Sequence, residues 1–144
     1  MIDACIADWH DFLRGRLEGG LDAILADDVV FYSPIVFTPQ SGKEVTKLYL
    51  NAAYATFGGD EPKRASGESA GSFRYVKEVL SGNHAVLEFE TMVEGKYVNG
   101  VDIITCDDDG KIVEFKVMIR PLQAVNLMHA QMKAMLEKMQ GQGA

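Results

Sequence analysis

The chain has 144 residues, of which 47% are hydrophobic and 24% charged, and this is typical of one globular domain. Its 14 basic residues are scattered among 21 acidic ones, so we expect no nucleic-acid binding, which needs clustered Lys and Arg. No apolar run approaches the roughly 18 residues that cross a bilayer, and the N-terminus lacks a leader pattern. We therefore expect no membrane interaction and a cytoplasmic location.

The cysteines and histidines do not suggest a metal site. Cys5 and Cys106 are far apart in sequence and lack metal-ligand spacing, which favours free, buried thiols over a disulfide. His10, His84 and His129 share no short spacing. We expect neither a metal nor a cofactor.

The N-terminal third predicts two helices and a strand. Residues 2–17 form a helix by the spacing of its apolar side chains, which are Ile2, Ile6, Trp9, Leu13 and Leu17. Gly19 and Gly20 are expected to end it. A short helix over residues 21–26 and a strand over residues 29–32 follow, and the strand is expected to break at Pro34.

A capping box predicts the start of the next helix. Ser41 can cap the helix while Glu44, three residues later, bonds back to it. The helix is expected to continue to Phe57, and Gly58 and Gly59 to end it. Residues 60–66 form a polar loop.

The remaining chain changes to strand periodicity. Strands are expected at residues 68–80, 85–93, 98–106 and 111–120, and tight turns at residues 81–84 and 107–110 join them. A last helix covers residues 122–139, and a flexible tail covers residues 140–144. Helices followed by hairpin-linked strands indicate an α+β fold with helices on one face of a curved antiparallel sheet.

Two segments resemble a known family. LADDVVFYSPIVFTPQSGKEVTKLY is similar to the early part of a nuclear-transport-factor-2-like domain of the SnoaL-like (polyketide-cyclase-like) group, and VDIITCDDDGKIVEF followed by MIRPL is similar to its final hairpin. The resemblance implies one domain over residues 1–144, a cone-shaped α+β barrel around a pocket closed by N-terminal helices, and a homodimer. The superfamily includes ketosteroid isomerase, limonene epoxide hydrolase, polyketide cyclases and non-catalytic members.

The resemblance assigns roles to only a few residues. Asp102, eight positions before Gly110, matches the isomerase aspartic acid that an apolar site keeps protonated as a hydrogen-bond donor. Ser33 stands where the isomerase base lies, and a hydroxyl is no base without an activating partner. No tyrosine precedes Tyr32, although the isomerase takes one from its first helix. We therefore do not expect that mechanism. Asp102 and Arg120 could supply two members of an epoxide-hydrolase Asp-Arg-Asp set.

Asp102 is the main candidate for chemistry. It shares a strand face with Ile104, and a buried carboxyl group must be bonded, paired or protonated. It either lines a pocket or is a structural residue. The residues expected to line or close an apolar pocket around it are Trp9, Phe31, Ser33, Tyr49, Phe89, Thr91, Val117 and Ile119.

Two functions and two surface interpretations remain open. The chain is either an enzyme using Asp102 on a small hydrophobic molecule, by isomerase, dehydratase, cyclase or hydrolase chemistry, or a non-catalytic ligand-binding or dimerisation module. Arg120 forms a salt bridge, a dimer contact or a substrate contact. The last helix carries a methionine stripe that packs on its own sheet or on a partner, made of Met128, Met132, Met135 and Met139.

Overall fold

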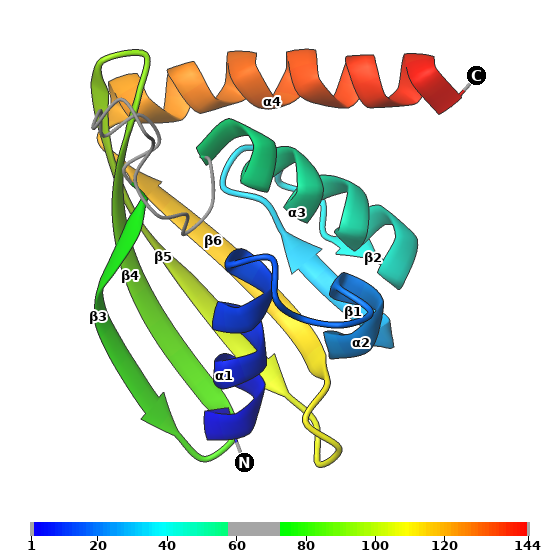
Figure 1. Cartoon of the computed structure of the whole chain (residues 1–144). Coiled ribbons are helices and arrows are strands. Elements are labelled where there is room, and N and C mark those ends of the chain that lie inside the picture. The colour runs from blue at the N-terminus through cyan, green and yellow to red at the C-terminus, as the bar shows by residue number, and fades with distance from the viewer. Residues whose placement is uncertain (1, 58–72, 144) are drawn as a thin grey trace.

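The computed structural model describes residues 2–57 and 73–143. The chain forms four helices and six strands in this part (Figure 1). The helices are α1 (Ile2–Leu13), α2 (Leu21–Ile24), α3 (Lys43–Phe57) and α4 (Leu122–Gly143). The strands are β1 (Leu25–Tyr32), β2 (Gln40–Ser41), β3 (Arg74–Ser81), β4 (His84–Val93), β5 (Lys96–Cys106) and β6 (Ile112–Arg120).

The six strands form one curved, unclosed sheet in the order β2-β1-β6-β5-β4-β3. The α+β prediction is confirmed, but the sheet is mixed rather than antiparallel because β1 pairs with β6 in parallel. Two turns predicted from Gly and Asp residues join β3 to β4 and β5 to β6. The parallel pair sets β1, an early segment, beside the last strand.

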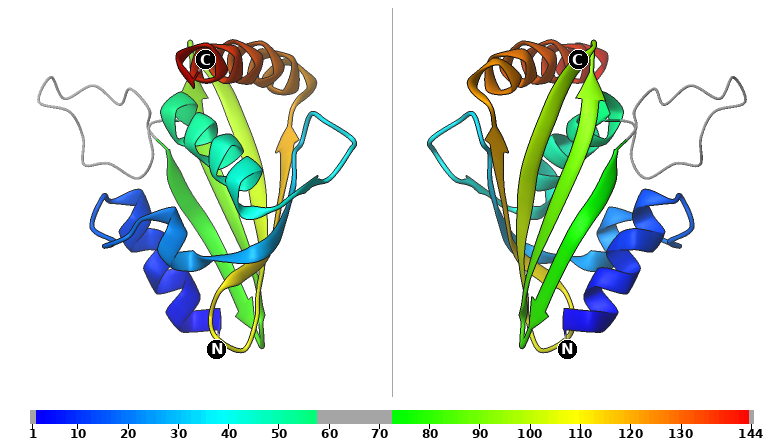
Figure 2. Two further views of the ribbon diagram at one scale, coloured as in Figure 1. Left: turned by 90° about the vertical axis from the view of Figure 1, so that its right-hand side faces the viewer. Right: turned by 90° about the vertical axis from the view of Figure 1, so that its left-hand side faces the viewer.

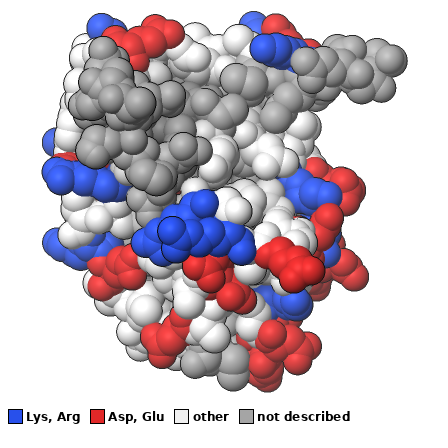
Figure 3. All heavy atoms as spheres, viewed as in Figure 1, with Lys and Arg blue, Asp and Glu red and all other residues white. Residues whose placement is uncertain are grey.

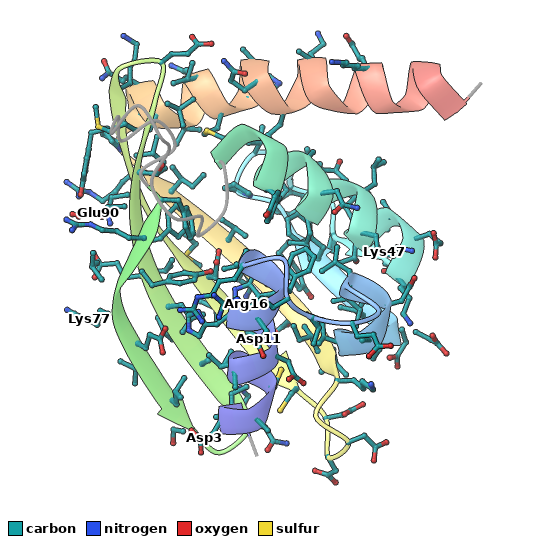
Figure 4. The ribbon with its side chains drawn as sticks, in the orientation of Figure 1. Asp3, Asp11, Arg16, Lys47, Lys77 and Glu90 are labelled. Atoms are coloured by element: carbon teal, nitrogen blue, oxygen red, sulfur yellow. The ribbon has the colours of Figure 1, made fainter. Side chains whose placement is uncertain are left out.

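The helices lie on the inner side of the sheet. α1 contacts β3, β4 and β5, while α3 contacts β1 and β4. α4 crosses the wide end of the sheet and packs on α3 and β6, as the two side views also show (Figure 2). Lys77 of β3 and Glu90 of β4 lie on the outer side, away from the helices (Figure 4).

Alternation along the strands separates the two faces. On β4, Leu87, Phe89 and Thr91 are buried on the inner face, whereas Glu88 and Glu90 face outward. Inner-face aromatic rings meet α1 at the centre of the core, where Trp9 and Phe115 have ring centroids 5.0 Å apart. The alternation read from the sequence is confirmed, and it places side chains from several strands around one interior.

The ends of the two N-terminal helices were predicted wrongly. α1 ends at Leu13 because Gly15 takes a φ of 71° and reverses the chain before the expected Gly19. α2 ends at Ile24, since Leu25 already pairs with Ile112 in the sheet. The predicted helix end at residues 25 and 26 is therefore strand.

The capping box was also predicted wrongly. Ser41 pairs with Val30 in the short strand β2, and α3 begins at Lys43 after Gly42, whose φ is 111°. Tertiary pairing of this segment with β1 thus takes precedence over the local capping signal. The expected helix end at residues 58 and 59, the loop at 60–66 and the start of the strand at 68–72 lie outside the described residues.

The C-terminal helix is longer than expected and continues to Gly143. Met128 is buried and Met132 is partly buried against the chain's own core, while the side chains of Met135 and Met139 lie outside the described set. Within the described segments, no helix has the length and apolarity needed to cross a membrane. Acidic and basic side chains are interspersed over the face seen in Figure 3.

Candidate functional site

An apolar cavity of about 70 Å³ lies between the inner face of the sheet and the helices. This volume is several times what one water molecule needs. Most of its walls are hydrophobic and aromatic. The lining residues are Trp9, Phe12, Leu13, Phe31, Ser33, Pro34, Ile35, Leu50, Ala53, Tyr54, Phe73, Tyr75, Phe89, Asp102, Phe115, Val117, Ile119, Met128 and Met132.

Asp102 is the carboxyl group of this lining. It lies in the middle of β5, pairs with Leu87 and Val117 on the neighbouring strands, and is 6% exposed. As expected from the alternation of side chains along the strand, Asp102 shares the inner face with Ile104. The two adjacent strands and the aromatic side chains around it exclude water from the carboxyl group on most sides.

Tyr75 and Trp9 connect to Asp102 through two hydrogen bonds. The Tyr75 hydroxyl donates to Asp102 Oδ2 at 2.6 Å, and the Trp9 indole N–H donates to the Tyr75 oxygen at 2.9 Å. Trp9 comes from α1, Tyr75 from β3 and Asp102 from β5. We call these three residues the donor chain, because every bond in it points toward Asp102.

Burial raises the pKa of Asp102 from 3.8 to about 7, although the hydrogen bond from Tyr75 acts in the opposite direction. Burial, and next the nearby Asp102 charge, raise the pKa of the Tyr75 hydroxyl well above 10. Tyr75 therefore keeps its proton at neutral pH. Asp102 is near the midpoint of its titration and is a mixture of the neutral acid and the anion.

When Asp102 is neutral, its own acid O–H is a further hydrogen-bond donor at the end of the donor chain. Oδ2 accepts from Tyr75, which leaves Oδ1 to carry the acid proton. Hydrogen bonds aligned in one direction polarise one another, so the terminal O–H becomes a better donor than an isolated acid. The arrangement can hold an acceptor atom, or stabilise negative charge that develops on it.

Most of the predicted pocket residues are brought together by the fold. Trp9, Phe31, Ser33, Phe89, Asp102, Val117 and Ile119 line the cavity. Tyr49 lies behind the wall and stacks on Phe31, with ring centroids 5.3 Å apart. Thr91 is buried on the inner face of β4 but outside the lining. A ligand contact by any of these residues stays a prediction.

Tyr75 was missed by the sequence analysis. The expected tyrosine of the first helix is absent, but a hydroxyl from β3 reaches the same carboxyl group, and α1 contributes Trp9 instead. The Trp9 indole N–H bonds Tyr75 and is linked to Asp102 only through that residue. Tyr75 lies two residues after Phe73, so alternation along the strand could have placed both side chains on the inner face. The β-bulge after Tyr75 shifts the pairing of β3 with β4, and the sequence does not reveal that shift.

The suggested pairing of Asp102 with Arg120 is wrong. Arg120 pairs with Asn99 on the outer face of the sheet, where its guanidinium donates to Asn99 Oδ1 at 3.0 Å. Asp102 points inward, so the sheet separates the two groups. The Asp-Arg-Asp arrangement for epoxide hydrolysis is therefore not formed by these residues.

The described residues contain no group of three or more His, Cys, Asp or Glu side chains that could hold a metal ion. Cys5 and Cys106 are free and buried, as predicted. Burial, with a smaller contribution from Cys106, raises the pKa of the Cys5 thiol to about 12. Burial also raises the pKa of the Cys106 thiol, so neither sulfur is an activated nucleophile.

Comparisons with known proteins agree with this architecture. No family model matches the chain, and no curated protein matches its sequence. A steroid delta-isomerase from Pseudomonas aeruginosa is 30% identical over 97% of this chain and 94% of its own, with a TM-score of 0.82.

Two more distant structures share the fold. An NTF2-like protein of unknown function from Mesorhizobium loti is 14% identical over 83% of this chain and 91% of its own, with a TM-score of 0.62. A SnoaL-like family protein from Agrobacterium tumefaciens is 13% identical over 82% of this chain and 96% of its own, with a TM-score of 0.54. The chain belongs to the nuclear-transport-factor-2-like superfamily, in its SnoaL-like group.

Proposed function

We propose that this protein binds a small apolar molecule through a carbonyl oxygen that accepts a hydrogen bond from neutral Asp102. The donor chain inside an apolar cavity carries this proposal. A buried carboxyl group with a pKa of about 7 and one oxygen bonded to Tyr75 is suited to donate from the other oxygen. The aromatic walls would hold the hydrocarbon body, and the single acid would orient it.

The donor chain also predicts selectivity between ligands. A hydrocarbon of the same shape would leave the Asp102 acid proton without an acceptor in an apolar surrounding, and an unpaired polar group is costly there. A ketone would satisfy it. The site should therefore prefer a polar-tipped ligand to its hydrocarbon analogue while Asp102 is neutral.

A second candidate is isomerase-type turnover in the same cavity. It is favoured by the 30% identity to a steroid delta-isomerase over nearly the whole chain. A ketone bonded to Asp102 would be polarised toward its enol, but isomerisation also needs a base to move a proton. Among the described lining residues, Asp102 is the single carboxyl group and there is no histidine. Binding without turnover is therefore the function that we favour.

Three rigid bicyclic probes of similar shape test the proposal: decalin, 2-decalone and decalin-2,6-dione. Trp9 is the chain's single tryptophan and lines the cavity, so its fluorescence reports binding of each. At pH 6, 2-decalone should bind more tightly than decalin by about two- to tenfold, the contribution of one hydrogen bond. Asp102→Leu should abolish the pH dependence of 2-decalone binding and keep decalin binding, because the freed Tyr75 hydroxyl can donate at every pH.

The pH dependence supplies a second readout. Only the fraction of protein with neutral Asp102 can donate, so the advantage of 2-decalone over decalin, about two- to tenfold at pH 6, should shrink above pH 7 and nearly vanish by about pH 9. Decalin binding should stay nearly constant. Equal binding of ketone and hydrocarbon at pH 6, or a pH dependence of ketone binding that survives Asp102→Leu, would reject the proposal.

A further inference from the structure

Ser33 has a hydroxyl group whose oxygen is already occupied. Ser33 Oγ accepts hydrogen bonds from the backbone N–H groups of Ile35 at 3.0 Å and of Val36 at 3.2 Å. A serine oxygen has two lone pairs and one hydrogen. The two bonds use both lone pairs and fix the position of the oxygen, while the hydroxyl hydrogen has no acceptor among the described residues. Ser33 is therefore a fixed donor on the cavity wall.

The pairing register places Ser33 across one strand from Asp102. Tyr32 pairs with Lys116 of β6, so Ser33 comes beside Val117, and Val117 pairs on its other side with Asp102. Two strand spacings separate the backbones of Ser33 and Asp102 by roughly 10 Å. Both side chains and Val117 line the cavity, with the apolar side chain between the two polar ones.

The other polar hydrogens of the lining are directed elsewhere. The Trp9 N–H bonds Tyr75, the Tyr75 O–H bonds Asp102, and the Tyr54 O–H bonds the carbonyl oxygen of Leu13 at 3.3 Å. Two donors are then left for a ligand: the Asp102 acid and the Ser33 hydroxyl. The cavity thus has two separate polar points joined by an apolar wall.

We propose that Ser33 is a specificity-determining residue that donates to a second acceptor, so that the preferred ligand is a rigid apolar molecule with an oxygen at each of two ends. This assignment rests on the proposed binding of a carbonyl oxygen by Asp102. Ser33 does not act as a base, because its lone pairs are engaged by Ile35 and Val36. The ligand class is a dione or hydroxyketone rather than a monoketone.

Titration of 2-decalone and decalin-2,6-dione into the wild type and Ser33 variants at pH 6 tests this assignment. Ser33→Ala should weaken binding of the dione about two- to tenfold, as one lost hydrogen bond does, and leave 2-decalone unchanged. Ser33→Thr keeps the hydroxyl and should bind both probes like the wild type. Ser33→Asp offers an acceptor to the two N–H groups but no donor hydrogen, so it repeats the test if Ser33→Ala fails to fold.

The outcomes separate the two proposals. Asp102-dependent binding of 2-decalone, together with a dione affinity that Ser33→Ala leaves unchanged, overturns the role of Ser33 alone. An equal loss for both probes in Ser33→Ala, or a Ser33→Thr variant that behaves like Ser33→Ala, also overturns it. If the wild type binds neither ketone better than decalin, both proposals fail.

Discussion

Replacing Asp102 by asparagine should change how folding stability depends on pH. The folded chain holds the Asp102 proton with a pKa of about 7 rather than 3.8. Between these values the folded protein keeps a proton that the unfolded chain releases. The contribution of Asp102 to the free energy of unfolding should therefore be greatest below pH 4, fall as the pH rises to 7, and level off above it.

The size of this effect follows from the shift. Each pKa unit corresponds to about 1.4 kcal/mol, so a shift of about three units amounts to about 4 kcal/mol. Asp102 is only 6% exposed, so solvent screens the effect little. The introduced asparagine would be neutral at every pH, and its side-chain oxygen can still accept from Tyr75. At pH 8 we therefore expect Asp102→Asn to be more stable than the wild type by up to about 4 kcal/mol.

Urea unfolding followed by circular dichroism at pH 4 to 8 measures the difference between the two proteins. Other groups that titrate on folding, such as Glu90, whose hydrogen bond from Tyr97 lowers its pKa, are common to both and cancel. Asp3→Asn, at the exposed start of α1 (Figure 4), is the matched control for loss of one charge. A difference for Asp102→Asn that stays constant over this range, or grows toward acid pH, would refute the reasoning.

Three further substitutions test the site and the packing of the sheet around it. Tyr75→Phe removes the bond that lowers the pKa of Asp102, so that pKa should rise above its wild-type value, and the unpaired Trp9 N–H should cost about 1–3 kcal/mol of stability in urea unfolding. Gly100→Ala should destabilise by about 1–3 kcal/mol, because a Cβ there would lie 2.6 Å from Phe89 Cζ and 2.5 Å from the Met118 carbonyl oxygen. Ser33→Asp adds a carboxylate to the cavity wall, and should raise isomerisation of a β,γ-unsaturated ketosteroid about 100-fold or more over the wild type, measured by absorbance of the conjugated product.

Each of these has a clear contrary result. An unchanged Asp102 pKa in Tyr75→Phe would mean that the hydrogen bond is not formed in solution. Wild-type stability of Gly100→Ala would mean that Phe89 does not pack over β5 as described. Rapid isomerisation by the wild type would show that a base is present and would favour the enzyme candidate. A Ser33→Asp variant without isomerase activity would indicate that this site does not use the mechanism of the isomerases.

Periodicity predicted the elements well where one face is buried and the other is wet. The alternation in β4 and the acidic turn before β6 define the hairpins without reference to the rest of the fold. The failures lie where distant pairing decides the outcome. Leu25 joins a strand because Ile112 pairs with it, and Ser41 leaves its capping position because Val30 pairs with it. No local pattern carries that information.

The site shows the same division. The alternation of side chains along β5 was enough to place Asp102 on the inner face of the sheet. Most of the other predicted lining residues lie on inner strand faces or on the apolar stripe of α1. Tyr75 could not be assigned because the bulge after it shifts the register between β3 and β4. The role of Ser33 depends on backbone N–H groups two and three residues later. The homodimer expected from the family resemblance stays a prediction.

The protonation state of Asp102 is the central claim, and a carbon NMR titration of its carboxyl group tests it most directly. We expect a pKa of about 7 in the free protein and a higher value with 2-decalone bound, because the ketone binds the neutral acid. Decalin should not raise it in this way. A carboxyl group that titrates near 3.8, or that 2-decalone leaves unchanged, would contradict both the neutral donor and the function proposed from it.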